Sequence, residues 1–238
     1  MNKVAIVVDG GFYRGRVARF GEEPEAAANT LYRYCQKHLY GDKEASSLYR
    51  VMYYDCAPST RKVFHPLLRK VVDLKKEPMY RWMTDFLDEL RKKRKFAVQL
   101  ASLADEQAMY QLKPGALKQL LNNEKRVSDL TEDDFFLTIR QKGVDSRIGI
   151  DIVTMALKKQ VDKIILIAGN SDFVTAAKFA RREGIDFVLD PMGMNIKAEL
   201  SEHIDGLKYF RLTLGKEFTP YRPAQQDGRM SRSADDFI

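Results

Sequence analysis

The amino-acid sequence predicts an α/β domain built on an open sheet of parallel strands flanked by helices. Residues 3–8 (KVAIVV) and 163–168 (KIILIA) are apolar runs without alternation, typical of strands buried on both faces. Segments of this kind alternate with helical patterns along the chain, as in βαβ units. With 238 residues, 45% of them hydrophobic, the chain can bury a core without metal or disulfide staples.

The same reasoning places each element in order. Strands are expected at 3–8, 48–54, 96–101, 135–140, 163–168 and 185–189. Helices are expected just after the first strand, at 25–38, 63–74, 79–94 and 145–159, from 173 to the glycine at 184, and around 196–204.

We expect three regions along the chain. Residues 1–212 form the main domain, and within it 102–134 is a polar insertion with one short helix. Residues 213–238 are polar, contain Pro, Gly and Ser, and are expected to form a mobile tail. The insertion or the tail, which carries Phe218, Tyr221 and Phe237, is a candidate site for a protein partner.

Composition excludes several classes of protein. No run approaches the roughly 18 apolar residues of a membrane span, and the N-terminus lacks a secretory cleavage site. The two cysteines, Cys35 and Cys56, cannot form a disulfide framework. A reducing, cytoplasmic location is therefore predicted.

Net charge favours a polyanionic partner. Forty Lys and Arg residues against 33 Asp and Glu give +7, with a pI near 9.2. Many soluble proteins carry such a charge for solubility alone, so charge indicates an electrostatic footprint rather than a function.

Four carboxylates stand near predicted strand ends. Asp9 ends the first strand, Asp172 begins the helix after KIILIA, and Asp145 and Asp151 lie in the helix before KIILIA. Ligands of open α/β sheets bind beyond the carboxyl ends of the strands, where the strand order reverses. If the first strand and KIILIA are neighbours there, the four carboxylates converge, and their repulsion calls for a divalent cation, Mg²⁺ or Mn²⁺.

Each acid also has a structural explanation. Asp9 precedes two glycines and suits a turn, and Asp172 suits a helix N-cap. Asp145 suits a cap as well, although Ser146 serves equally. Asp151 is harder to explain in this way, because Asp is a poor helix former and it lies among isoleucines.

Other strand-end chemistries lack their motifs. The glycines from Gly10 to Gly15 fit neither a dinucleotide fingerprint nor a phosphate loop, since Arg16 and Val17 replace its Lys and hydroxyl residues. Gly11 stands where an aspartyl phosphatase has its second acid. No G-x-S-x-G elbow occurs, and the three histidines are scattered.

Three segments together resemble a known family. VVDGGFYRGR, KGVDSRIGIDIVTMAL and IAGNSDFVTAAKFARREGIDFVL, in this order, resemble the NYN domain of the PIN-like nuclease superfamily, especially its LabA-like bacterial branch. The resemblance covers roughly residues 3–210.

This resemblance implies a Rossmann-like, PIN-type sheet and a Mg²⁺-dependent ribonuclease. Metal-binding and catalytic acids would be Asp9, Asp145, Asp151 and Asp172, with Lys142 beside the site and Asn170 and Ser171 on its rim. Family members often read S-G-D-S-D-F where this chain reads A-G-N-S-D-F, so Asn170 removes one negative charge.

Contacts to RNA are expected from the segment after the first strand. Arg14, Arg16 and Arg19 would hold phosphates. Phe12 and Tyr13 would stack a base, with packing of Phe12 against the sheet as the alternative. The basic run 91–95 is a second candidate, although cations also suit a helix C-terminus.

We therefore predict a metal-dependent ribonuclease acting on RNA. The alternative is a catalytically inactive module that binds RNA, a nucleotide or a protein partner through the same crevice, which Asn170 favours. A homodimer is expected by analogy with related small sheet domains.

Overall fold

The structure is a computed structural model, and it describes residues 1–17, 21–40, 45–170, 172–211 and 219–220. Its strands are β1 (Asn2–Asp9), β2 (Ser46–Cys56), β3 (Lys62–His65), β4 (Lys70–Asp73), β5 (Phe96–Leu103), β6 (Met109–Leu112), β7 (Phe135–Thr138), β8 (Gln141–Lys142), β9 (Lys163–Ile167), β10 (Asp186–Asp190), β11 (Gly206–Leu207), β12 (Phe210–Arg211) and β13 (Thr219–Pro220). Its α-helices are α1 (Gly10–Val17), α2 (Pro24–Lys37), α3 (Pro78–Lys92), α4 (Pro114–Leu121), α5 (Val144–Leu157), α6 (Val174–Arg182) and α7 (Ala198–Ser201). Short 3₁₀ helices occur at η2 (Leu74–Lys76), η3 (Asp105–Gln107), η4 (Val127–Asp129) and η5 (Glu132–Asp134).

Seven strands form the main sheet, in the order β11-β10-β9-β1-β2-β5-β8. All of its neighbouring pairs are parallel except β5 with β8. β1 lies between β2 and β9, so the strand order reverses between β1 and β9. The predicted open parallel sheet and the predicted neighbourhood of the first strand and KIILIA are therefore confirmed.

Helices cover both faces of this sheet, so each central strand is buried on both sides. Along β1, Val4, Ile6 and Val8 face a core that includes residues of α1, α2 and α3. Ala5 and Val7 face a second core formed with α5 and α6. This burial explains the continuous apolar run of β1, because both sets of alternating side chains need an apolar residue.

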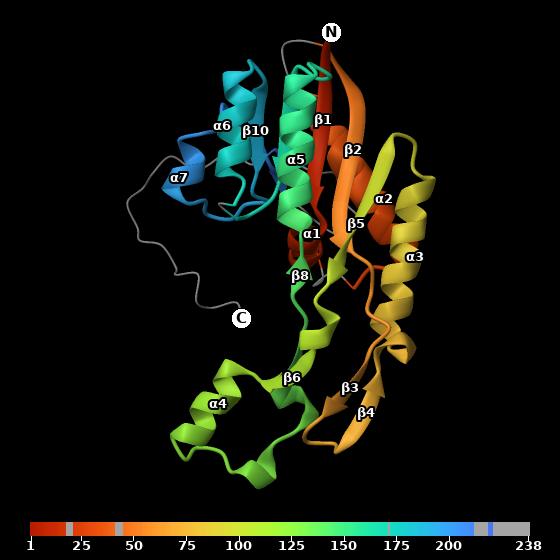
Figure 1. Cartoon of the computed structure of the whole chain (residues 1–238), viewed down its shortest axis with the longest axis vertical. Helices are drawn as coiled ribbons and strands as arrows, with labels where there is room; N and C mark the ends of the chain where they lie inside the picture. The colour runs from red at the N-terminus through yellow and green to blue at the C-terminus, as the bar shows by residue number, and fades with distance from the viewer. Residues whose placement is uncertain (18–20, 41–44, 171, 212–218, 221–238) are drawn as a thin grey trace.

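A separate arm projects from the carboxyl edge of the sheet (Figure 1). We define the arm as the β3–β4 hairpin together with β6, α4 and β7; the chain enters it from the ends of β2 and β5 and returns through β8. β6 and β7 pair with each other and not with the main sheet. The ring of His65 in β3 packs on Tyr110 in β6, with centroids 4.3 Å apart, which joins the two hairpins.

The predicted helix over 63–74 is wrong, because this segment forms the β3–β4 hairpin. Pro66 disfavours helical backbone at the residue before it, and Arg69 turns the chain with a positive φ of 51°. The flanking Val63, Val71 and Val72 favour strands. Strand 135–140 is confirmed as β7 over its first part, but it lies in the arm, and the expected short helix of the insertion is α4. The tail at 213–238 lies outside the described residues apart from 219–220.

Candidate functional site

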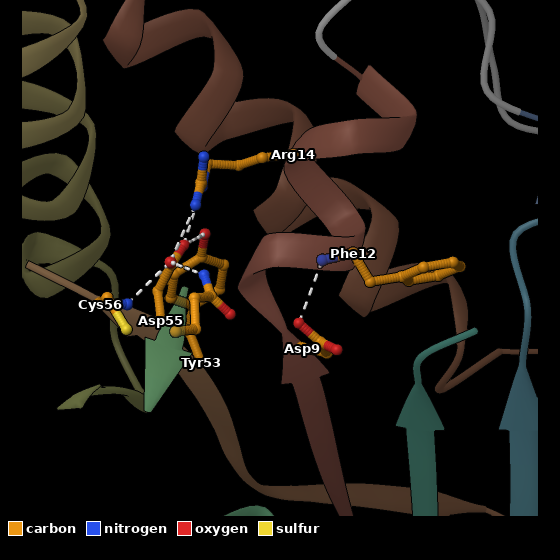
Figure 2. A network of polar contacts seen from close by, with 7 residues as sticks. Asp9, Phe12, Arg14, Tyr53, Asp55 and Cys56 are labelled. Atoms are coloured by element: carbon orange, nitrogen blue, oxygen red, sulfur yellow. Dashed lines mark hydrogen bonds and ion pairs between the residues drawn. The ribbon is translucent and has the colours of Figure 1, made fainter. Parts of the chain in front are cut away.

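The candidate site has a buried carboxylate at its floor. Asp9 ends the central strand β1 and is 9% exposed. Its Oδ1 accepts a hydrogen bond from the backbone N–H of Phe12, at 3.0 Å, because α1 begins immediately after the strand (Figure 2). Burial raises the pKa of Asp9, and the nearby charges of Asp145 and Asp55 raise it further.

Two more carboxylates lie at the exposed rim. Asp145 is in the first turn of α5, and Asp172 follows β9 across the switch point. Burial raises the pKa of Asp145, and the charge of Asp172 adds to that shift. Asp145 thus lies within electrostatic reach of both Asp9 and Asp172.

The amide of Asn170 bridges the two rim acids. Its Nδ2 donates to Asp172 Oδ2 at 2.9 Å, and its side chain also hydrogen-bonds Asp145, which lowers the pKa of that carboxyl. Its Oδ1 is buried and has no hydrogen-bond partner among the described residues. A buried amide oxygen without a partner is costly, so this atom suits a donor or a cation supplied by a ligand.

Asp151 does not join this group, so the expected convergence of four acids is wrong for this residue. It lies six residues beyond Asp145 on α5, about 9 Å along the axis. Its Oδ2 accepts a 2.6 Å hydrogen bond from the hydroxyl of Tyr54 in β2, and it lines a separate hollow with Met52 and Ala97. Asp151 therefore ties α5 to β2, which explains an Asp inside that helix.

A further carboxylate, Asp55 at the end of β2, was missed by sequence reasoning. It is fully buried and accepts bonds from Arg14 Nε (2.8 Å), Arg14 Nη2 (2.9 Å), the Tyr53 hydroxyl (2.8 Å) and the Cys56 backbone N–H (2.8 Å) (Figure 2). Burial by itself lowers the pKa of Arg14, but the bonds to Asp55 raise it above its ordinary value. The signal was present, since Asp55 is the last residue but one of the strand beside β1, close to the edge at which Asp9 ends β1.

The two glycines after Asp9 let these groups approach α1. A Cβ at Gly10 would lie 2.5 Å from the Tyr53 hydroxyl and 2.6 Å from Asp55 Oδ2. A Cβ at Gly11 would meet the side-chain amide of Gln141 at 3.1 Å and Asp9 Oδ1 at 3.5 Å. Gln141, which sequence reasoning also missed, therefore lies near both Asp9 and Asp55. Its Nε2 donates a hydrogen bond to Asp55 Oδ1 at 3.3 Å.

The residues predicted to bind RNA have other partners in the structure. Arg14 is held by Asp55, and its side chain is 29% exposed. Arg16 Nη2 donates to the carbonyl of Met192 at 3.3 Å. Lys142 is exposed and faces Glu106 Oε1 at 3.4 Å, while Ser171 and Arg19 lie outside the described residues.

Phe12 packs against the loop after β9, in line with the packing alternative. A Cβ at Gly169 would lie 2.3 Å from the Phe12 ring, so this ring needs a glycine beneath it. Figure 2 shows Phe12 directed away from Asp55, toward the strands on the other side of β1.

Gly169→Ala is therefore expected to destabilise the protein by about 1–3 kcal/mol, because the new methyl group must displace a half-buried ring. Gly149→Ala is the matched control, since a Cβ at this α5 position meets nothing within 4 Å. It is expected to stabilise the protein by roughly 0.5–1 kcal/mol. Thermal unfolding of the two variants checks both signs, and equal midpoints would contradict the proposed packing.

The oxygen donors near Asp9 are of the type that Mg²⁺ prefers. Among the described residues, no three His, Cys, Asp or Glu side chains are close enough to enclose one ion. Mg²⁺ needs no such cage, because it keeps several waters and binds through one or two carboxylates. Asp9, Asp145 and Asp172 offer oxygen ligands whose mutual repulsion a cation relieves, and Asn170 Oδ1 offers a neutral one.

A groove beside this site extends toward the arm. It has a volume of about 470 Å³ and is lined by Arg14, Asp55 and Gln141 at the sheet and by Tyr80, Tyr110 and Leu137 toward the arm. Its walls mix aromatic, apolar and hydrogen-bonding groups, and their aromatic rings are of the kind on which bases can stack.

Comparison with known proteins identifies the family. The family model of the NYN domain matches residues 83–201, half of the chain. The chain belongs to the NYN domain family. This family is part of the PIN-like nuclease superfamily, in agreement with the observed sheet, and its members are generally nucleases that act on RNA.

The matching model describes the NYN domain in general, and it does not assign the chain to the LabA-like branch. Among curated proteins, none matches the chain. The solved structure of a protein of unknown function from Vibrio parahaemolyticus is similar over 87% of this chain and 91% of that chain, with 16% sequence identity and a TM-score of 0.45.

Proposed function

We propose that this NYN protein is a Mg²⁺- or Mn²⁺-dependent ribonuclease whose acids are Asp9, Asp145 and Asp172. The observation that carries the proposal is the position of Asp145 within electrostatic reach of both Asp9 and Asp172, near the switch point between β1 and β9. Such a site repels the phosphates of RNA unless a cation offsets its charge. Asp151 has a supporting role in this proposal, since it positions α5 through Tyr54.

A divalent cation, when bound, supplies a Lewis acid that activates water and stabilises the charge on phosphate. The remaining work falls to the side chains of this chain. Asp9 holds fixed negative charge at the buried floor, and Asn170 keeps the two rim carboxylates in position through hydrogen bonds. Gln141, beside Asp9, has an amide N–H to offer a phosphate oxygen, and the groove aligns the strand.

The proposed substrate is RNA, and the proposed location is the cytoplasm. We also propose that two copies of the chain pair, or that a protein partner binds the insertion or the tail. In the part of the chain that the structure describes, no helix has the length and apolar character needed to cross a bilayer.

A second candidate function is a non-catalytic RNA-binding module. It is favoured by Asn170, which bears no charge where related sequences often carry an acid, and which already satisfies the rim acids. This alternative predicts salt-dependent RNA binding without turnover in either metal.

Cleavage of labelled single-stranded RNA and matched DNA, with Mg²⁺, Mn²⁺ or EDTA, separates the two candidates. Asp172→Asn is expected to lower metal-dependent RNA cleavage by at least about 100-fold, because it removes a charged oxygen ligand. The control is Asp85→Asn, which neutralises an exposed carboxylate on α3. Full activity of Asp172→Asn, or no cleavage by the wild type in either metal, would refute the ribonuclease.

A further inference from the structure

We propose that the β3–β4 hairpin binds single-stranded RNA and feeds it into the groove of the candidate site. The inference rests on the proposed ribonuclease function and assigns a binding surface that neither the sequence motifs nor the acidic cluster indicates. Four features of the hairpin carry it: charge, lack of ion pairs, an exposed apolar pair, and continuity with the groove.

The hairpin and the turn after it are strongly basic. Between residues 61 and 77 there are six cations and two acids, a net charge of +4 with His65 neutral. Residues 104–142, which contain the rest of the arm and β8, have six cations and seven acids, so the positive charge of the arm is concentrated on the hairpin. The six cations are Arg61, Lys62, Arg69, Lys70, Lys75 and Lys76.

These cations are available to an anionic ligand. All six residues are exposed, and none forms an ion pair with a described residue. Of the nearby acids, Asp73 accepts a hydrogen bond from the backbone N–H of Lys75. Glu77 and Glu132 line a hollow beside the hairpin together with Lys70 and Lys76, without forming an ion pair with either lysine. Unpaired cations concentrated on one element are the electrostatic footprint of a phosphate backbone.

An apolar pair stands among these charges. Phe64 is 56% exposed and Val71 is 60% exposed, and the two are cross-strand partners in the hairpin. Paired residues of an antiparallel ladder point to the same face, so they form one small apolar platform. An exposed aromatic ring within a basic surface is the arrangement on which single-stranded binders stack bases.

The hairpin leads into the groove of the candidate site. Leu74 follows β4 directly and lines the groove together with Tyr110, whose ring contacts His65 of β3. Arg14 and Gln141 line the same groove at its other end, beside the acids. The arm projects from the carboxyl edge of the sheet (Figure 1), so a strand held by the hairpin and lying in the groove runs toward the edge at which β1 ends with Asp9.

The test measures binding apart from cleavage. Fluorescence anisotropy of a labelled oligouridine of about 12 nucleotides, in EDTA, reports binding by the full chain. Phe64→Ala is expected to weaken binding by about 5- to 150-fold, the loss of one stacked base. In wild type, the logarithm of the binding constant is expected to fall linearly with the logarithm of salt concentration. The triple variant Arg69→Gln, Lys70→Gln, Lys75→Gln is expected to make this slope less steep by about 0.7 for each phosphate that it no longer neutralises.

Matched controls lie at the opposite edge of the sheet. Leu157→Ala removes a side chain that is 57% exposed, and Lys158→Gln removes an exposed cation next to it. Both controls should bind as the wild type does. Circular dichroism of every variant verifies the fold, which substitutions at exposed positions are expected to preserve.

The outcomes separate this inference from the proposed function. Weaker RNA binding by the hairpin variants supports the hairpin even if the wild type never cleaves RNA, a result that would refute the ribonuclease alone. Unchanged binding and cleavage in the hairpin variants would refute the hairpin and leave the ribonuclease standing. Absence of wild-type binding to the oligouridine would also refute the hairpin, and a protein partner would then be the occupant to test.

Discussion

Asp9→Asn is expected to abolish RNA cleavage and, at the same time, to raise the thermal stability of the protein. The activity falls by at least about 100-fold because the variant loses the charged oxygen at the floor of the site. Stability rises because the folded protein holds this carboxylate in a buried position beside Asp145 and Asp55, which disfavours its charged form. An Asn keeps an oxygen that accepts the bond from the Phe12 N–H.

The stability gain has a defined pH dependence. Since the pKa of Asp9 in the folded protein lies above its ordinary value of 3.8, the folded state binds more protons than the unfolded state between these two values. The wild type therefore loses stability as pH rises through this window, and Asp9→Asn does not. The difference in unfolding midpoint between variant and wild type should be larger at neutral pH than below pH 3.8.

Thermal unfolding at several pH values, without added divalent metal, checks this prediction. Each kcal/mol of difference moves the midpoint by roughly 2–4 °C in a chain of this size. Asp9→Ala is the matched control, because it removes the same charge together with the acceptor for the Phe12 N–H, and it should be less stable than Asp9→Asn. A lower midpoint for Asp9→Asn than for the wild type at neutral pH would contradict the proposed electrostatics.

Among the variants proposed for this protein, Asp55→Ala is expected to lose the most stability, about 3 kcal/mol in the free energy of unfolding. This loss corresponds to a thermal unfolding midpoint lower by about 6–12 °C. The buried carboxylate satisfies the Arg14 guanidinium, the Tyr53 hydroxyl and a backbone N–H. Removing it leaves all three donors without their acceptor and leaves one charge partly buried. Because α1 then loses its tie to β2, cleavage should fall as well.

The control for this variant is an exposed ion pair of similar chemistry. Asp88→Ala breaks the 2.6 Å contact with Arg91 on α3, where both side chains are about half exposed, and should cost less than about 1 kcal/mol. Urea or thermal unfolding of Asp55→Ala and Asp88→Ala gives the comparison. Similar stabilities of the two variants would show that the Arg14–Asp55 contact does not hold the site together.

The sheet was predictable from the sequence because its central strands are buried on both faces. The continuous apolar runs of β1 and β9 have no competing interpretation at strand length. Asp9 is the last residue of β1, and Asp172 lies in the loop after β9. The arm was less predictable. The sequence of β3 and β4 contains enough apolar residues for a helical pattern, and the turn at Arg69 depends on backbone geometry that no residue type signals.

Side-chain roles were harder to predict than strand ends. Asp151 and Asp55 are both acids near buried strands, and their partners decide their roles: Tyr54 holds Asp151 away from the site, whereas Arg14 neutralises Asp55 beside it. Arg14 was assigned to phosphate binding because its place after β1 was known, while its buried partner was not. Contacts of this kind depend on strand order, since β1 and β2 lie adjacent only in the folded sheet.

The position of β1 also determines which part of the chain a folded fragment must contain. The NYN match begins at residue 83, inside α3, so β1 and β2 lie before it. β1 is nevertheless hydrogen-bonded to β2 on one side and to β9 on the other, and it joins the two halves of the sheet. A fragment of residues 83–201 would keep β9 and β10 but expose the whole edge of β9, together with the apolar faces that β1 covers, so it should aggregate rather than fold. The functional unit of this protein is thus larger than the segment by which its family is identified.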